Sequence, residues 1–340
     1  MLKVPLMNAS QEEEMFYDQL RNWGQNELAP HALEWDEEEE LPAPILSEAE
    51  ALGLYSLTFK EEQDGLELSF RTALLVVETL AQYEASLALK IALLNGPVAQ
   101  CWPSELPIAQ ATWAHGSVQL TEEGASGVLH DVPWTESARW VMVPQVDRLY
   151  MIDLQSEGVE CKAHRNRLGL RCAEWADLIL TGAKTQVFPL CSEDRQKAEA
   201  RLQLGWAAVA LGLGTAGAYL GTVYAQNRVQ FNQPLTQFQA IQWMIADNQT
   251  ELDAVRLSMY ASADLLDEQL STGVRMAAQT RLLASEAGHL SCDRGLQMHG
   301  GYGYTQEYHI ERLWRNVQRC FPTEGQKGLV STIIQDLTRP

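Results

Sequence analysis

A single carboxylate, Glu324, lies in a break bounded by proline and glycine close to the end of the 340-residue chain. The break reads FPTEGQKG from residue 321 to 328, and sequence that favours helices flanks it on both sides. A carboxylate in an apolar pocket has a raised pKa, because burial disfavours its charged form, and it can then act as a general base. Taken alone, a glutamate in such a loop is more simply a capping or solvent-facing side chain. The surrounding sequence decides between these two interpretations.

The glycines from Gly212 to Gly217 match the dinucleotide-binding fingerprint GxGxxG letter for letter. That motif needs a strand before it, a helix after it and an acidic residue about 20 positions further on. Here the next acidic residue is Asp247, 35 positions after Gly212, and the flanking residues are typical of one alanine-rich helix. We interpret these glycines as points where neighbouring helices of a bundle approach closely.

The cysteines and histidines do not form a convincing metal site. Cys161 and His164 are two possible ligands, but nothing near them completes a tetrahedral set. The six cysteines are scattered and contain no CxxC pair, which is typical of reduced thiols in a cytoplasm. The sequence therefore predicts no bound metal and a cytoplasmic location.

The formal net charge of −20 argues against two classes of partner. A surface of this sign repels phosphate backbones and anionic lipid headgroups, so we expect neither nucleic-acid binding nor membrane association. The N-terminus turns acidic before an apolar run forms, so it does not resemble a signal peptide. The most apolar stretch, 202–225, is interrupted by glycines and is better explained as a bundle helix than as a membrane span.

The periodicity of apolar residues changes twice along the chain and predicts three domains. Residues 1–108 are expected to be helical, with one largely buried helix in the stretch from 69 to 96 and a solvated connection at 36–44. Residues 109–192 contain short β-prone runs separated by turn residues, which predicts a small β-barrel or sandwich. Residues 193–340 return to helical patterns. An all-helical protein with an irregular insert is the alternative architecture.

The last region predicts a four-helix bundle. One long helix should present a single apolar face, because its apolar residues recur at spacings of three, four and seven. Another should end at Gly300 and Gly301, which can adopt the left-handed conformation of a helix C-cap. The residues of the apolar face are Phe238, Ile241, Ile245, Leu252, Val255 and Met259.

Three segments of this region, in their order and spacing, resemble the acyl-CoA dehydrogenase family. They are RVQFNQPLTQFQAIQ from residue 228, LQMHGGYGYTQEYHIERLWRN from residue 296, and the TEG that contains Glu324. The resemblance is strong from about 195 to 335, extends into the N-terminal helices and is weak in the β region. It implies an N-terminal α domain, a middle β domain and a C-terminal four-helix bundle, with FAD as the cofactor.

The resemblance changes the interpretation of Glu324. In the family's common arrangement, a glutamate 24 positions after the first glycine of the Gly-Gly pair is the catalytic base, and counting from Gly300 reaches Glu324. It would take the α-proton of an acyl-CoA thioester while the β-carbon passes hydride to FAD. The flavin supplies the hydride sink for that chemistry.

Family dimers build each FAD site from two subunits, and the half that a subunit gives to its neighbour is intact here. By position, Arg228 matches the arginine that contacts the pyrophosphate, and Phe231 matches the aromatic residue three positions later. Gln297, Gly300 and Gly301 match the residues that approach the adenine end of the cofactor. The resemblance thus implies these five residues as cofactor contacts.

The half that a subunit provides for its own FAD departs from the family pattern. A loop at 120–127, LTEEGASG, stands where the family has a TEPxxGSD-type loop, in a β region that is shortened. Trp134 and Thr135 are uncertain matches for the Trp-x-Ser/Thr strand beside the flavin ring. The residues at 326–328 replace Thr-x-Gln, and Gln203 replaces a bundle arginine near the base.

This pattern is similar to that of the short subunits of steroid-side-chain acyl-CoA dehydrogenases, which are α2β2 heterotetramers. Three functions remain open: a subunit of an FAD-dependent acyl-CoA dehydrogenase, a non-catalytic subunit that completes a partner's FAD site, and a homodimeric enzyme complete by itself. The resemblance also implies an acyl-CoA substrate, a homo-oligomer or a heterotetramer with a second acyl-CoA dehydrogenase subunit, and electron-transfer flavoprotein as the electron acceptor.

Overall fold

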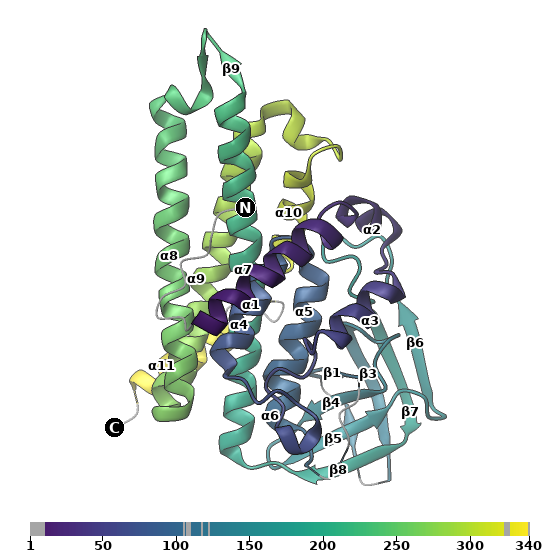
Figure 1. The fold of residues 1–340 in the computed structure, drawn as a ribbon. Helices are drawn as coiled ribbons and strands as arrows, with labels where there is room; N and C mark the ends of the chain where they lie inside the picture. Colours follow the sequence, from purple (N-terminus) through teal and green to yellow (C-terminus); the bar gives the residue numbers. More distant parts are fainter. Residues whose placement is uncertain are drawn as a thin grey trace.

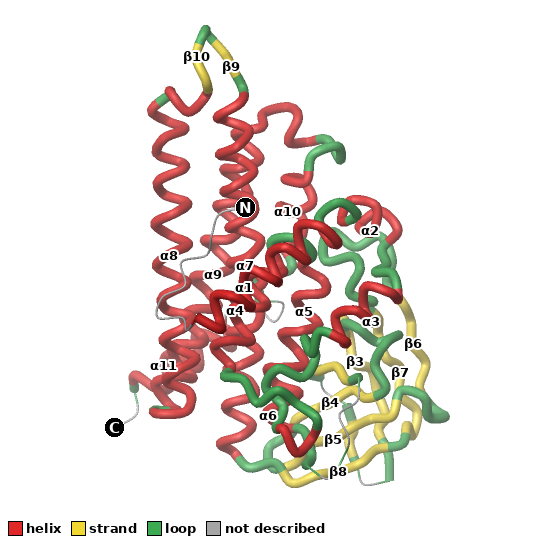
Figure 2. Tube along the Cα trace, viewed as in Figure 1, coloured by secondary structure: helices red, strands yellow, loops and turns green. Residues whose placement is uncertain are grey.

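The computed structural model describes residues 11–104, 106, 110–116, 118–121, 123–322 and 327–338. Along the chain, helices precede and follow a middle β region, and in space the C-terminal helices stand upright beside the sheets (Figures 1 and 2). This order confirms the predicted fold and excludes the all-helical alternative. The domain boundaries remain predictions, although helix gives way to strand between Cys101 and Ala111, and strand to helix between Pro189 and Ser192.

The N-terminal region is built from short helices around an apolar core. Its helices are α1 (Gln11–Trp23), α2 (Ala32–Glu38), α3 (Ala43–Ala51), α4 (Phe70–Ala81), α5 (Ala85–Leu93) and α6 (Ala99–Cys101). Every residue from Leu74 to Leu94 is buried, as the uniformly apolar sequence predicts. The predicted single helix over this stretch is wrong in one respect, because the chain breaks at 82–84. There the Glu84 carboxylate accepts the backbone N–H of Ser86 and caps the second helix.

The middle region forms two four-stranded sheets with the strand orders β1-β4-β5-β8 and β2-β3-β7-β6. Residues of both sheets share one apolar cluster, as in a sandwich. The β-prone runs in the sequence did not predict β1, β3 or β6. We assigned the start of β3 to a turn because of the glycines there. The strands are β1 (Ala111–Trp113), β2 (Gln119–Leu120), β3 (Ala125–Val132), β4 (Trp140–Pro144), β5 (Arg148–Asp153), β6 (Val159–Ala163), β7 (Ala176–Ala183) and β8 (Thr185–Pro189).

The C-terminal bundle is formed by α7 (Ser192–Asn227), α8 (Gln239–Glu268), α9 (Leu270–His299), α10 (His309–Gln318) and α11 (Lys327–Leu337). The glycines of the GxGxxG match lie inside α7, which confirms their packing role. A Cβ on Gly214 would lie 2.8 Å from Gly288 of α9, and one on Gly217 would lie 2.9 Å from Cys292. By length and composition α7 could span a membrane, but 72% of its apolar window is buried inside the protein, as in the core helix of a soluble bundle.

The apolar face predicted for α8 is buried along only half of its length. Leu252, Val255 and Met259 are buried, whereas Phe238, Ile241 and Ile245 are partly exposed. This half of α8 leads to a hairpin of β9 (Val229–Gln230) and β10 (Gln233–Pro234), which projects at the end of the bundle (Figure 1).

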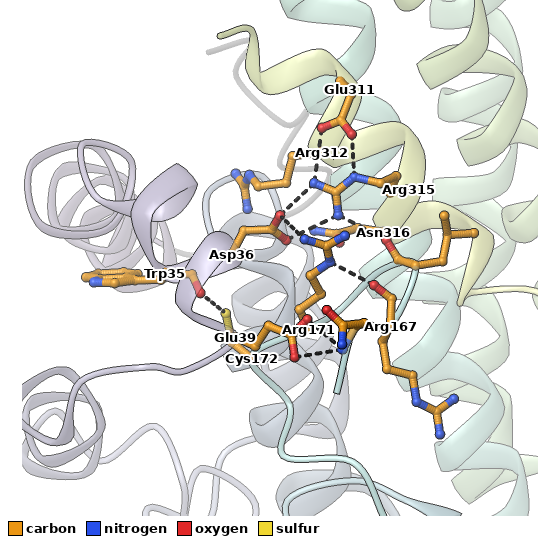
Figure 3. A network of polar contacts seen from close by, with 12 residues as sticks. Trp35, Asp36, Glu39, Arg167, Arg171, Cys172, Glu311, Arg312, Arg315 and Asn316 are labelled. Atoms are coloured by element: carbon orange, nitrogen blue, oxygen red, sulfur yellow. Dashed lines mark hydrogen bonds and ion pairs between the residues drawn. The ribbon is translucent and has the colours of Figure 1, made fainter. Parts of the chain in front are cut away.

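A buried polar network joins the three regions where α2, the segment 164–175 and α10 meet (Figure 3). Asp36 is 4% exposed and accepts the guanidinium of Arg315 at 2.6 Å. Arg315 also binds Glu311 at 2.5 Å and the backbone carbonyl of Leu168 at 2.9 Å. We predicted from sequence that Asp36 lies in a solvated connection, and this prediction is wrong: Asp36 is buried in α2. Nothing local in the sequence indicated this, because the arginine that pairs with Asp36 is 279 residues away.

Candidate cofactor site at the end of the bundle

The hairpin at the end of the bundle turns through two residues with left-handed backbone conformation. The φ angles of Phe231 and Asn232 are 50° and 64°, as the tight turn between two short strands requires. Asparagine adopts this conformation readily, but a phenylalanine does so at a cost. The side chain of Phe231 is nevertheless 87% exposed, and its ring meets that of Phe238 in an edge-to-face arrangement with ring centroids 6.3 Å apart. Its aromatic surface is therefore available at the tip.

Arg228 lies where α7 ends and the hairpin begins. Its backbone N–H donates to the carbonyl of Tyr224 and its carbonyl accepts from Leu235, which fixes the base of the hairpin. Its guanidinium lies 6.0 Å from the ring centroid of Tyr302 and is exposed. Among the described residues it forms no ion pair with a carboxylate. The charge of this arginine is thus free to meet an anionic group.

The end of α9 supplies the predicted glycine pair. Gly300 has φ 61° and ψ −138°, a backbone conformation that essentially only glycine adopts, and its N–H donates to the carbonyl of Gln297. The expected positive φ is confirmed, but the ψ angle differs from that of a left-handed cap. A Cβ on either Gly300 or Gly301 would meet no atom within 4 Å, so the backbone here borders open space.

Arg228, Gly300 and Gly301 border one open cavity of about 460 Å³, although Arg228 is 72 positions from Gly300 in sequence. The structure therefore brings together three of the predicted cofactor contacts. Gln297 is exposed nearby and Phe231 lies on the hairpin tip, but neither borders this cavity. The remaining residues of its wall are Tyr224, Gln230, Leu235, Met298, His299, Tyr302 and Thr305.

Sequence reasoning missed an aromatic cluster that includes Tyr224, His299 and Tyr302 of this wall and Tyr308 next to them. Tyr224 stacks on His299 with ring centroids 4.2 Å apart, and Tyr308 meets both rings edge-on at 6.2 and 5.6 Å. Tyr302 lies 5.7 Å from Tyr308. A signal existed in the sequence, because Tyr224 stands one helical turn before Arg228 and His299 directly precedes the glycine pair.

The cavity fits part of a dinucleotide cofactor. An unpaired guanidinium suits a phosphate, flat aromatic side chains suit a heterocyclic ring, and glycine backbone permits close approach. None of the described residues that border the cavity is acidic, so none of them opposes a phosphate there.

The middle domain offers a poorer fit to a flavin. The hydroxyl of Thr121 is engaged in its own turn, where it donates to the Gly124 carbonyl at 2.9 Å. Trp134 is 2% exposed, and the ammonium of Lys90 lies 4.6 Å from its ring centroid. Thr135 donates to the Glu174 carbonyl at 2.9 Å. The hydroxyls of Thr121 and Thr135 are therefore paired within the protein and the ring of Trp134 is buried, although its indole Nε1 has no hydrogen-bond partner among the described residues.

The remaining predictions about the site divide between described and undescribed residues. Glu324 lies outside the described residues. Gln203, which replaces the bundle arginine, is half-buried, and the nearby Arg201 stacks over Phe70 at 4.8 Å. Among the described residues there is no cluster of three or more potential metal ligands, and the six cysteines are free.

Comparison with known proteins identifies the family. The chain matches the acyl-CoA dehydrogenase N-terminal domain over residues 10–103 and the acyl-CoA dehydrogenase C-terminal domain over 198–336. A probable acyl-CoA dehydrogenase of Bacillus subtilis is 26% identical, over 96% of this chain and 97% of that protein. A subunit of a caffeyl-CoA reductase–Etf complex of Acetobacterium woodii is 29% identical over 55% of this chain and 51% of that protein.

The fold is also found among solved structures. A glutaryl-CoA dehydrogenase of Mycobacterium smegmatis in complex with FADH2 superposes with a TM-score of 0.84 at 18% identity, over 97% of this chain and 95% of that one. At this identity the likeness establishes the shared fold alone.

Proposed function

Because the chain belongs to the acyl-CoA dehydrogenase family, we propose that it is a subunit of an FAD-dependent enzyme that introduces an α,β double bond into an acyl-CoA thioester. The cavity that joins Arg228, Gly300 and Gly301 is the observation that carries this proposal. These three residues were expected from sequence to contact FAD, and they border the cavity beside aromatic rings. The expected substrates are bulky acyl groups, such as steroid side-chain or polycyclic acids.

In the proposed reaction Glu324 accepts the α-proton of the substrate and becomes a neutral carboxylic acid. The hydride leaves the β-carbon, and a bound flavin would accept it. Arg228 and the backbone at Gly300 and Gly301 would hold the phosphate and nucleoside portions of the cofactor. Electron-transfer flavoprotein is the proposed oxidant of the reduced enzyme, a role in keeping with the relative from an Etf complex.

A second function has its own support. The engaged side chains of Thr121 and Trp134 favour a subunit that completes a partner's FAD site and holds no flavin of its own. The partner would be a second acyl-CoA dehydrogenase subunit in a heterotetramer. The free thiols are consistent with the cytoplasmic location that we propose for the complex.

Purification separates these functions from a self-sufficient homodimer. A colourless chain that gains a flavin absorbance band only when co-expressed with a neighbouring-gene partner supports a heteromeric enzyme. A yellow protein purified alone supports the homodimer instead.

The role of Glu324 is tested by Glu324→Gln in the flavin-containing assembly. If Glu324 is the base, turnover falls by about 10²–10⁴-fold while flavin content stays unchanged, because an amide of the same shape cannot accept the proton. Glu307→Gln is a matched control, since it makes the same chemical change at an exposed carboxylate. A wild-type rate for Glu324→Gln would assign catalysis to the partner's carboxylate.

A further inference from the structure

Arg281 differs from the other buried arginines of this chain. Four arginines are buried in the described part of the chain, and three of them pair with a buried carboxylate. Arg281 is 3% exposed, and among the described residues it forms no ion pair, while its Nε and one terminal nitrogen have no hydrogen-bond partner. The three pairs are Arg256 with Glu78, Arg312 with Glu84 and Arg315 with Asp36.

The described groups around this guanidinium supply no negative charge. Arg281 projects from α9 over the ring of Trp206 in α7, with 5.1 Å between its Cζ and the ring centroid. The titratable group that acts on it is the thiol of Cys320, just after α10, and burial raises the pKa of that thiol to about 12. Burial also lowers the pKa of Arg281 to about 10. Near pH 7 the thiol is therefore neutral and the guanidinium is charged.

The backbone around Arg281 is fixed. The hydroxyl of Ser285, one turn further along α9, lies 2.8 Å from the carbonyl oxygen of Arg281 and 3.1 Å from that of Cys320. These contacts hold α9 against the chain that leaves α10, and the Ser285 proton is already engaged. A buried charge without a partner is strongly destabilising, so an anion that reaches this guanidinium should bind there.

The chemistry of this place selects a carboxylate that is attached to an apolar group. A guanidinium can bind a carboxylate through two parallel N–H···O bonds, and a single charge is less costly to bury than a doubly charged phosphate. The half-buried indole of Trp206 offers apolar surface for the group that carries the carboxylate. Gln203, which the family resemblance puts near the base, precedes Trp206 by three positions in α7. This proximity favours the acyl part of the ligand.

We propose that Arg281 binds a free carboxylate on the acyl group of the CoA thioester, and that the enzyme therefore prefers acyl groups with a second carboxyl group. The inference rests on the proposed function and narrows its substrate class. It makes Arg281 a specificity-determining residue, because the guanidinium acts on the far end of the acyl group and not on the carbons that react.

Melting of the ligand-free protein tests whether the guanidinium is unpaired. Arg281→Met should raise the melting temperature by about 2–5 °C, because it removes a buried charge and keeps an apolar side chain against Trp206. Arg275→Met is the matched control on the same helix. The Nε of Arg275 donates to Asp336 at 2.7 Å, so its loss should not stabilise the protein. A lower melting temperature for Arg281→Met would mean that the guanidinium is paired within the chain, and would overturn the proposal.

Calorimetric titration of the assembled protein tests the ligand. The mono-CoA thioesters of α,ω-dicarboxylic acids of increasing length are each compared with their methyl ester, which differs in the terminal charge. Each ligand already carries the α,β double bond, so that no turnover disturbs the titration. At the length that fits, the free carboxylate should bind about 10–100-fold more tightly, as a charge-assisted hydrogen bond predicts.

Two variants assign this preference to a residue. Arg281→Met should weaken the carboxylate ligands to the affinity of their esters, whereas Arg275→Met should keep the preference. Equal affinities at every length, no binding at millimolar concentrations, or a preference that survives in Arg281→Met would each overturn the proposal. Failure of the proposed function is measured separately, by turnover and flavin content. A protein that shows the preference without dehydrogenase activity would retain the carboxylate site and lose the enzyme.

Discussion

Arginine side chains at the end of the bundle and in its interior differ in exposure and in whether they are paired with a carboxylate. At the end, Arg228 is exposed without a carboxylate partner in the described chain, and the aromatic side chains of Phe231 and Tyr304 are 87% and 83% exposed. In the interior, Arg256 donates to the fully buried Glu78 at 2.7 Å, and Arg312 donates to Glu84 at 3.1 Å. Both interior arginines are at least 95% buried.

This difference separates side chains that hold the fold from those that are open to a ligand or a second subunit. A buried charge without a partner is strongly destabilising, and these two interior arginines each have a carboxylate partner within the chain. An exposed cation carries no such penalty and can remain unpaired until an anion binds. In the middle domain, Thr121, Trp134 and Thr135 likewise contact partners within the chain. This is the observation that favours the proposal of a supporting subunit without its own flavin.

The largest effect on stability is expected from Arg256→Met. Among the described residues, this change leaves the buried Glu78 carboxylate with the Tyr260 hydroxyl, 3.1 Å away, as its one remaining donor. The free energy of unfolding should fall by about 3–5 kcal/mol, measured by urea denaturation, with no direct effect on the cavity at the bundle end. The double variant Glu78→Gln/Arg256→Met should recover much of this loss. If Arg256→Met were as stable as the wild type, a buried ion pair would matter no more for stability than the exposed Arg228, and the comparison would fail.

Arg228→Ala is the matched change at the open end. It should alter the free energy of unfolding by less than about 0.5 kcal/mol, because the side chain is exposed and unpaired. The assembled enzyme should retain FAD about 10–100-fold less tightly, since a charge-assisted contact to phosphate contributes about 1.5–3 kcal/mol. Flavin occupancy after dialysis measures this. Unchanged occupancy would show that the family correspondence fails at this position.

The smallest effect, a stabilisation, is expected from Lys90→Met in the buried helix α5. Burial lowers the pKa of Lys90 to about 8, and its ammonium donates to Ser137 at 2.8 Å. Replacement should raise the free energy of unfolding by about 1 kcal/mol at pH 7, because removing the desolvated charge outweighs the lost contacts. In the wild type between pH 8 and about 10.4 only the unfolded state holds this proton, so stability rises with pH.

The advantage of Lys90→Met should therefore shrink across that range. Thermal unfolding of both proteins at a series of pH values gives the difference. An advantage that stays constant from pH 7 to 10 would mean that Lys90 is not titrating there.

The fold could be predicted where local pattern and tertiary environment agree. The long bundle helices, the α-β-α order and the packing role of Gly214 and Gly217 follow from periodicity and small residues, and all are confirmed. The strand from Ala125 to Val132 was missed because Gly124 before it and Gly127 within it are typical of a turn, whereas its pairing with a neighbouring strand is a non-local property.

The sequence by itself determined the family, the helical character of the N- and C-terminal regions, and the spacing of Arg228, Gly300 and Gly301. These properties depend on short motifs and on local backbone preferences. Only the tertiary structure decided that these three residues share one cavity, that Tyr224 and His299 stack in its wall, and that Asp36 is buried against Arg315. The physical reason is distance along the chain. Contacts between residues 70 to 280 positions apart leave no periodic trace in sequence, and they form only when packed helices and sheets bring their surfaces together.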